Sequence, residues 1–261
     1  MNILYVAWQD PNDRHWRPVG RLSFEDERFR FVYTYGAKTA KNFLPFGRMT
    51  NLHSVYESSE LFPLFSNRLL NKNRPEYEEY LEWLNIPAGK DDPLALLGRS
   101  GGIRGTDSLV IFPCPEPTSE GKYTLSFFSQ GLRYLTREAL EVIGNLKSEN
   151  QLYLLLDVQN TIDPSAVAIR TEKPLCIIGY IPRYFAEDFH FLLQGECNNS
   201  VRVYVDQVNQ NAPIQFRLLC RINADWPETF KPCSGEMYQP LASPSDQIKL
   251  REKPEAIKQY T

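Results

Sequence analysis

The chain has 261 residues and a formal net charge of −3, with 29 Lys and Arg against 32 Asp and Glu. Hydrophobic residues make up 42% and charged residues 23%, values typical of a folded protein, so the composition excludes a disordered or fibrous chain. The slightly acidic balance also excludes a protein that coats nucleic acid through bulk positive charge, and any site for a polyanion has to be local.

The first part of the sequence predicts strands followed by short helices. Apolar and polar residues alternate, as they do in a strand and a hairpin, in residues 2–8, 19–23 and 29–35. Further along the chain the apolar residues recur at spacings of three and four, which predicts two short helices near 64–69 and 77–84.

A glycine-rich segment at 98–105 precedes a predicted strand at 108–112. It lacks the Lys and the Ser or Thr that follow the last glycine of a phosphate-binding loop, so we expect a structural turn. Three prolines then occur in five residues, at Pro113, Pro115 and Pro117, and prolines cannot donate the hydrogen bonds of a helix or a strand. This run predicts a stiff linker and a domain boundary near residue 118.

The second part of the sequence is richer in strands. Six segments have the composition of strands, at 122–128, 152–156, 166–170, 176–181, 201–208 and 214–222. Thr136 can cap a helix that presents Ala139 and Ile143 on one apolar face, and a second helix is predicted at 184–193. Several short strands with a helix packed across one end predict a small barrel, an architecture that often binds nucleic acids.

The predicted fold class is therefore α+β. We expect a small mixed domain of sheet and helices over residues 1–117, followed by an OB-like, six-stranded β-barrel with packed helices over 122–230. The tail at 231–261 carries four prolines among polar residues, and it is predicted to be a loosely attached arm.

No arrangement of residues typical of an enzyme or a metal site occurs in the sequence. His15, His53 and His190 lie far apart, and no cysteine stands at metal-ligand spacing from them. The five cysteines are scattered, which fits reduced thiols in a cytoplasmic protein, and the apolar start of the chain is too short for an export signal or a membrane span. We therefore expect no catalysis, no metal and no cofactor. The alternative is a nuclease, in which Asp157 and Asp163 would have to bind metal ions.

A few residues have the chemistry needed to bind an end of single-stranded nucleic acid. Arg133 and Tyr134 follow the predicted strand at 122–128, and they can pair with a phosphate and stack on a base. Asp163 precedes a proline that holds it extended, so it can point outward and accept a hydrogen bond from a hydroxyl group.

Three more residues complete the candidate site. Tyr180 and Arg183 lie where a strand passes into a helix, and the backbone amides of a helix N-terminus favour an anion. Asn160 lies in the turn before Asp163, where its side chain and that of Asp157 are expected mainly to close the turn on itself. Together these residues suit stacking on bases, pairing with phosphates and recognition of a terminal hydroxyl.

The second part of the chain also resembles a known family. The matching motifs are GLRY at 131–134, LLLD at 154–157, NTIDPSAV at 160–167 and IGYIPR at 178–183. With them, residues 123–222 resemble a HIRAN domain, which implies an OB-like barrel that binds single-stranded DNA and prefers a free 3′-hydroxyl end. The resemblance further implies that Arg133 and Tyr134 contact backbone and base, that Asp163 accepts from the 3′-hydroxyl, and that Tyr180 and Arg183 hold the penultimate phosphates.

The sequence departs from that family at the predicted end site. Ile162 stands where end-binding members carry a stacking aromatic residue, and Pro164 and Ser165 replace a Lys and an Asn. Acidic residues also outnumber basic ones by two in 122–230, so DNA affinity is expected to be modest unless arginines gather on one face.

The first part resembles the small N-terminal subdomain of the HipA family of toxin kinases. The matching segments are VGRL at 19–22, FRFVY at 29–33, LPF at 44–46, LFPLFSNRL at 61–69 and DPLALLG at 92–98. In that family this piece packs on the kinase core and does not bind ATP, so the resemblance implies a docking or regulatory module.

Two hypotheses remain open for the whole chain. In the first, it is a non-catalytic protein whose second part binds single-stranded DNA or DNA 3′ ends and whose first part docks to a protein partner. In the second, it is a regulatory component of a toxin-kinase or phage-defence complex, and its barrel does not bind DNA.

Overall fold

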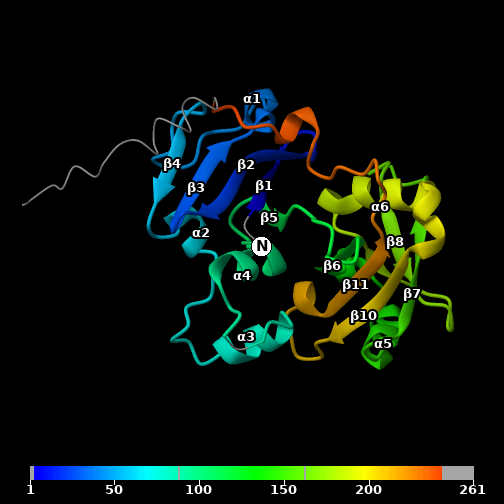
Figure 1. Ribbon diagram of the computed structural model, residues 1–261. Helices are drawn as coiled ribbons and strands as arrows, with labels where there is room; N and C mark the ends of the chain where they lie inside the picture. The colour runs from blue at the N-terminus through cyan, green and yellow to red at the C-terminus, as the bar shows by residue number, and fades with distance from the viewer. Residues whose placement is uncertain (1–2, 88, 162, 243–261) are drawn as a thin grey trace, which may run out of the picture.

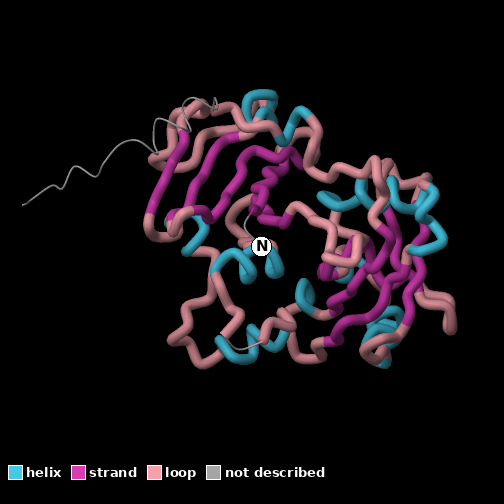
Figure 2. Tube along the Cα trace, in the orientation of Figure 1, coloured by secondary structure: helices cyan, strands magenta, loops and turns pink. Residues whose placement is uncertain are grey.

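The computed structural model describes residues 3–87, 89–161 and 163–242, and it divides into two lobes that are each built on one antiparallel sheet (Figure 1). All strands up to residue 113 belong to the first sheet, and all strands from residue 122 onward belong to the second. Figure 2 shows the strands gathered in these two groups with the helices around them. The predicted α+β fold class is confirmed. Within the described residues, no helix is long and apolar enough to cross a membrane.

The first sheet has the strand order β4-β3-β2-β1-β5. Its strands are β1 (Ile3–Gln9), β2 (Trp16–Glu25), β3 (Arg28–Tyr33), β4 (Val55–Ser58) and β5 (Leu109–Pro113). The β2–β3 hairpin turns at Asp26 and Glu27, whose positive φ angles of 51° and 60° suit a two-residue hairpin turn. Strand β4 was not predicted, because four residues are too few to establish an alternating pattern.

The helices of the first lobe are α1 (Tyr35–Thr39), α2 (Pro63–Ser66), α3 (Tyr77–Trp83) and α4 (Pro93–Ser100). Helix α4 corrects the expectation of a glycine-rich turn over 98–105, because Gly98 and Ser100 lie inside the helix. The Asp92 carboxylate caps this helix by accepting from the backbone N–H groups of Leu94 and Ala95, each at 3.0 Å. Gly101, with a φ of 74°, ends it, so the turn proper begins there.

The second sheet has the strand order β6-β11-β10-β7-β8-β9. Its strands are β6 (Lys122–Phe128), β7 (Gln151–Leu156), β8 (Val167–Arg170), β9 (Ile177–Tyr180), β10 (Arg202–Val208) and β11 (Leu218–Asp225). Around it lie α5 (Arg137–Asn145), α6 (Ala186–Gln194) and the 3₁₀ turns η1 (Leu132–Tyr134), η2 (Arg183–Phe185), η3 (Glu196–Ser200) and η4 (Ile214–Phe216). A further 3₁₀ turn, η5 (Glu236–Tyr238), contacts β2 and α1 of the first lobe. The last strand begins at Leu218, because the first residues of the predicted segment form η4.

The second sheet curls into a half-barrel because its two edge strands meet at one end. Gln130, just after β6, and Tyr180, at the end of β9, exchange both backbone hydrogen bonds, at 2.8 and 3.0 Å. Gly179 makes this approach possible: its φ is 133°, and a Cβ atom there would lie 2.0 Å from the Ser129 hydroxyl oxygen. The close backbone approach thus requires glycine at this position.

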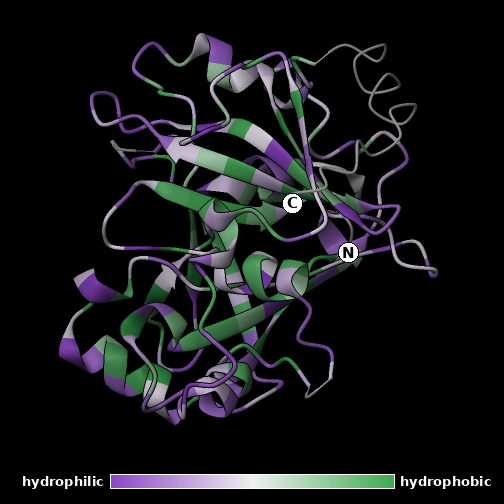
Figure 3. Ribbon diagram, turned by 90° about the vertical axis from the view of Figure 1, so that its left-hand side faces the viewer, coloured by the Kyte–Doolittle hydropathy of each residue, from purple (hydrophilic) through white to green (hydrophobic). Residues whose placement is uncertain are grey.

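Aromatic residues join the two lobes. The Phe112 ring at the end of the first sheet stacks on Tyr184, with ring centres 4.8 Å apart and an angle of 27°. At a second contact, Trp83 of α3 stacks on Phe216 of the second lobe, and the Asn209 amide donates to the Trp83 carbonyl at 2.9 Å. Figure 3 shows apolar residues along the strands of both lobes and polar residues in the outer loops. Aromatic stacking therefore contributes to the contact between the lobes.

The chain returns to the first lobe after β11, and this corrects the expectation of a loose arm from residue 231. The Tyr35 N–H donates to the Gln239 carbonyl at 2.8 Å, and the Leu241 N–H donates to the Tyr33 carbonyl at 2.9 Å. The short turn η5 lies beside α1 (Figure 1), and the Tyr238 ring packs edge-on against Tyr5 at 5.0 Å. Residues 231–242 are thus a strap held on the first sheet, while 243–261 lie outside the described residues.

The closure of the half-barrel generates a stability prediction. Replacing Gly179 with Ala should lower the free energy of unfolding by about 3 kcal/mol or more, because the new Cβ forces Ser129 or the Gln130 backbone to move and strains the positive φ. Chemical denaturation monitored by circular dichroism measures the change. Gly105→Ala is the matched control, since nothing lies within 4 Å of its Cβ position. An equal effect of the two variants would contradict the closure argument.

A partly buried carboxyl group in α6 generates a pH prediction. Burial raises the pKa of Asp188 to about 7 from its ordinary value of 3.8, although a hydrogen bond donated by the Tyr123 hydroxyl opposes the shift. Between these two values the folded protein holds a proton that the unfolded chain has lost. The free energy of unfolding should therefore fall as pH rises from about 4 to 7, by at most about 1.4 kcal/mol per pH unit.

The variant Asp188→Asn isolates this contribution, because it keeps the acceptor for Tyr123 and cannot titrate. The wild type should lose stability relative to the variant as pH rises through this window, as measured by urea denaturation at a series of pH values. A difference between the two proteins that does not change with pH would show that the carboxyl group titrates normally.

Candidate functional site

A single groove between the lobes, of about 740 Å³, brings together all the binding residues predicted from the sequence. These residues are Arg133, Tyr134, Asn160, Asp163, Tyr180 and Arg183. They meet because the backbone pairing of Gln130 with Tyr180 places the turn after β6 beside the segment after β9. Residues distant in the sequence therefore share one surface.

Arg133 and Tyr134 form the exposed part of this site. Gly131, with a φ of 80°, turns the chain out of the sheet, and the Tyr134 N–H closes the turn by donating to the Gly131 carbonyl at 2.9 Å. The Arg133 guanidinium lies 5.5 Å from the centre of the Tyr134 ring. The Tyr134 residue is 82% exposed. Across the described part of the chain, no carboxylate pairs with Arg133. The two side chains offer a cation and an aromatic face to solvent.

Asn160 and Tyr180 are held by a third residue, Asp157. One Asp157 carboxylate oxygen accepts from the Asn160 amide at 3.0 Å and from the Tyr180 hydroxyl at 3.2 Å. Burial and, to a smaller degree, the Asp157 charge raise the pKa of Tyr180. The Asn160 side-chain oxygen in turn accepts from the Asp163 N–H at 3.0 Å. Asn160 and Asp157 thus close the turn on itself, and they position Asp163 and Tyr180 in the groove.

The sequence predicted that the Asp163 carboxylate points outward, and the structure shows that it does not. One of its oxygens pairs with the Arg183 Nε at 3.0 Å, and the other accepts from the Ser165 N–H at 3.0 Å. Only 16% of the Asp163 side chain is exposed. The following proline fixes the backbone, but the partner Arg183 decides the direction of the side chain. Each carboxylate oxygen keeps acceptor capacity for a further hydrogen bond.

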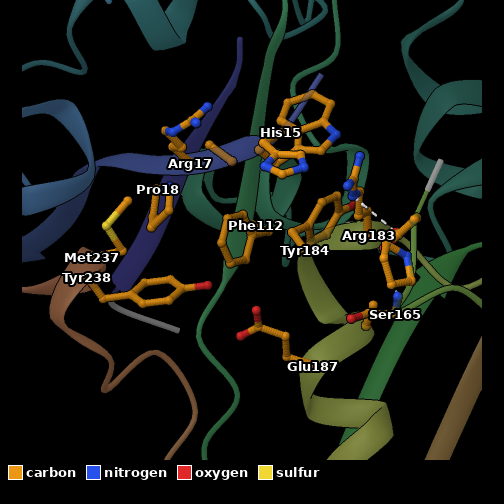
Figure 4. Close-up of a pocket in the computed structure, with 15 residues that line it drawn as sticks. His15, Arg17, Pro18, Phe112, Ser165, Arg183, Tyr184, Glu187, Met237 and Tyr238 are labelled. Atoms are coloured by element: carbon orange, nitrogen blue, oxygen red, sulfur yellow. Dashed lines mark hydrogen bonds and ion pairs between the residues drawn. The ribbon is translucent and has the colours of Figure 1, made fainter. Parts of the chain in front are cut away.

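Arg183 links the two lobes at this point. While its Nε holds Asp163, its Nη1 donates to the backbone carbonyl of Arg14 in the first lobe, at 3.1 Å. On the other side of the ion pair lies a pocket of about 420 Å³, which Trp16 and Tyr184 line together with Asp163 and Arg183 (Figure 4). The Asp163–Arg183 pair and these aromatic residues therefore separate the groove from a pocket between the lobes.

The first lobe contributes residues to the groove that the sequence did not predict. Arg14 comes from the loop before β2 and Trp16 is the first residue of that strand, while Ile103 and Arg104 come from the turn after α4. The turn had been expected to have a structural role alone. No periodic pattern marks these residues, because their role depends on how the lobes pack.

The described residues include no metal-binding cluster and no disulfide. Among them, no group of three or more His, Cys, Asp or Glu could hold a metal ion. The four cysteines whose side chains the structure describes, Cys114, Cys176, Cys220 and Cys233, are free thiols. Ile162, which occupies the family's stacking position, lies outside the described residues.

The geometry predicts which groove residues are needed for folding. Arg183→Ala should lower the free energy of unfolding by about 1–3 kcal/mol, because it leaves the half-buried Asp163 carboxylate without its ion-pair partner. Tyr134→Ala should change it by less than about 0.5 kcal/mol, since that side chain is exposed. Thermal unfolding of the two variants tests the contrast, and a larger loss at Tyr134 would contradict the described packing.

Comparison with known proteins identifies the second lobe. Residues 122–223 match the family described as HIRAN domain. The match does not extend to residues 1–117, whose resemblance to the HipA subdomain stays a prediction. No curated protein matches the chain.

Two solved structures are similar to part of the chain, both with a TM-score of 0.30. The crystal structure of the HIRAN domain of human HLTF is 17% identical, and the similarity covers 41% of this chain and 81% of that one. A protein from Lactobacillus plantarum is 19% identical over 40% of this chain and 99% of its own. On the strength of the family match, residues 122–223 of this chain are a HIRAN domain.

Proposed function

We propose that the protein binds single-stranded DNA at its 3′ end, in the groove between the lobes, and does not catalyse a reaction on it. The observation that supports this most is the exposed pair of Arg133 and Tyr134 at the closed end of the half-barrel, in one groove with Asp163 and Arg183. The HIRAN family assignment and the resemblance described above point to the same ligand.

The chemistry of the exposed pair fits a strand of nucleic acid. A guanidinium group binds a phosphate through two parallel hydrogen bonds, and Arg133 has no carboxylate competitor among the described residues. A tyrosine ring stacks on any base, because every base has a flat face. Tyr134 therefore favours single strands, whose bases are accessible, and confers little dependence on sequence.

The ion pair at the inner end of the groove fits a strand terminus. Asp163 can accept from a 3′-hydroxyl with its remaining lone pairs, while the adjacent Arg183 attracts the last phosphates. A terminal phosphate would instead place extra negative charge against the Asp163 carboxylate, which is repulsive. The pair thus provides a physical basis for preferring a hydroxyl end.

The docking of a protein partner to the first lobe remains part of the proposal. It rests on the HipA-like segments of the sequence, and the described structure selects no particular partner. The face of this lobe that carries Phe112 and α3 is already covered by the HIRAN domain, so a partner would bind elsewhere on the lobe.

A comparison of oligonucleotide ends tests the proposed function. A short single strand with a 5′ fluorophore and a 3′-hydroxyl should bind about tenfold more tightly than the same strand with a 3′-phosphate, as measured by fluorescence anisotropy at low salt. Asp163→Ala should abolish the difference. Arg133→Ala should weaken both strands equally, because it contacts a phosphate that both contain.

The outcomes separate the parts of the proposal. Equal binding of both ends by the wild type would overturn end recognition and leave single-strand binding in place. No binding of either strand at low salt would overturn the function as a whole.

A further inference from the structure

The groove that holds the HIRAN residues has a second wall, and the first lobe builds it. The first-lobe residues that line the groove include Gln9, Arg14, Trp16, Ile103, Arg104 and Gly105. They come from the end of β1, the loop before β2, the start of β2 and the turn after α4. A ligand lying in the groove would therefore touch both lobes.

The charges that line this groove are mostly positive, although the chain as a whole is acidic. The charged lining residues are Arg14, Arg104, Arg133, Arg183, Asp107 and Asp163. Each aspartate already has a cationic partner: Asp107 pairs with Arg68 at 2.5 Å, and Asp163 pairs with Arg183 at 3.0 Å. The three remaining arginines are exposed and have no carboxylate partner in the described ranges. Two of these three belong to the first lobe.

The backbone of Arg14 is fixed beside the inner end of the groove. Its N–H donates to the Asp10 carbonyl at 2.9 Å, and its carbonyl accepts from the Gln9 amide at 2.9 Å and from Arg183 at 3.1 Å. The residue has a φ of 59°, a left-handed conformation that bulky residues seldom adopt. The guanidinium that holds Asp163 thus also fixes the point from which the Arg14 side chain extends.

Arg104 lies on the turn that faces the end of β6. Its neighbour Ile103 lines a small second cavity together with Phe128 and Gln130, which places this turn against the HIRAN domain. Ile103 is 47% exposed, so it offers an apolar surface next to an unpaired cation. The Arg104 guanidinium supplies positive charge of the kind that follows a nucleic-acid backbone along a groove.

We propose that the first lobe is part of the DNA-binding site: Arg14 and Arg104 bind phosphates of a single strand that lies between the lobes. This inference rests on the proposed function and adds a role for the first lobe that its sequence did not suggest. The HIRAN domain then supplies one wall of the site, with Arg133 and Tyr134, and the first lobe supplies the other.

Charge-removing variants of the full chain test this proposal. Arg14→Gln and Arg104→Gln should each weaken binding of a 3′-hydroxyl single strand several-fold at low salt. Each should also reduce the slope of log affinity against log salt by about 0.7, which is the contribution of one phosphate contact in a single strand. Arg133→Gln is the positive control and should behave in the same way.

Arg74→Gln is the matched negative control, because this arginine is exposed on the same lobe and lines a different hollow. It should leave affinity and salt slope unchanged. If the Arg14 and Arg104 variants match the Arg74 variant while Arg133→Gln weakens binding, the inference is overturned and the proposed function stands. If Arg74→Gln weakens binding as much as the others, binding depends on the overall charge of the lobe and not on Arg14 and Arg104 in particular, and the inference again fails. If the wild type binds no strand, both fail together.

Discussion

The backbone pairing between Gln130 and Tyr180 is the contact on which the candidate site depends. It joins the two edges of the second sheet, and it is possible only because Gly179 has no side chain to collide with Ser129. Without this pairing, the turn that carries Arg133 would have no fixed position relative to the strand end that carries Arg183. The same pairing therefore shapes the half-barrel and assembles the groove.

A second constraint acts between the lobes. Arg183 holds the Asp163 carboxylate with one nitrogen and the Arg14 carbonyl with another, so a single guanidinium sets the spacing of the groove walls at its inner end. The stacked rings of Phe112 and Tyr184, which line the neighbouring pocket, support the same junction. A strand bound here would meet a site whose geometry exists before it arrives, which reduces the entropy lost on binding.

Most of the second lobe could be predicted from the sequence because six segments have the composition of strands and its motifs resemble a family. The direction of the Asp163 side chain could not, since the neighbouring proline restricts only the backbone and the ion-pair partner lies in a distant turn. The strap at 231–242 was misjudged for a related reason: its main attachment is backbone hydrogen bonding to Tyr33 and Tyr35, which leaves no mark on side-chain composition. The contribution of Arg104 depends on the packing of two lobes, which no local pattern encodes.

The strap also affects the order in which the protein can fold. Domains usually fold as units during synthesis, and the N-terminal one comes first. Here Tyr35 of α1 and Tyr33 of β3 receive backbone partners from Gln239 and Leu241, which are made after the residues of the HIRAN domain. The first lobe is therefore completed only after the second lobe has been made, when Tyr238 can pack on Tyr5. Completion of the first lobe is thus a late event of biosynthesis.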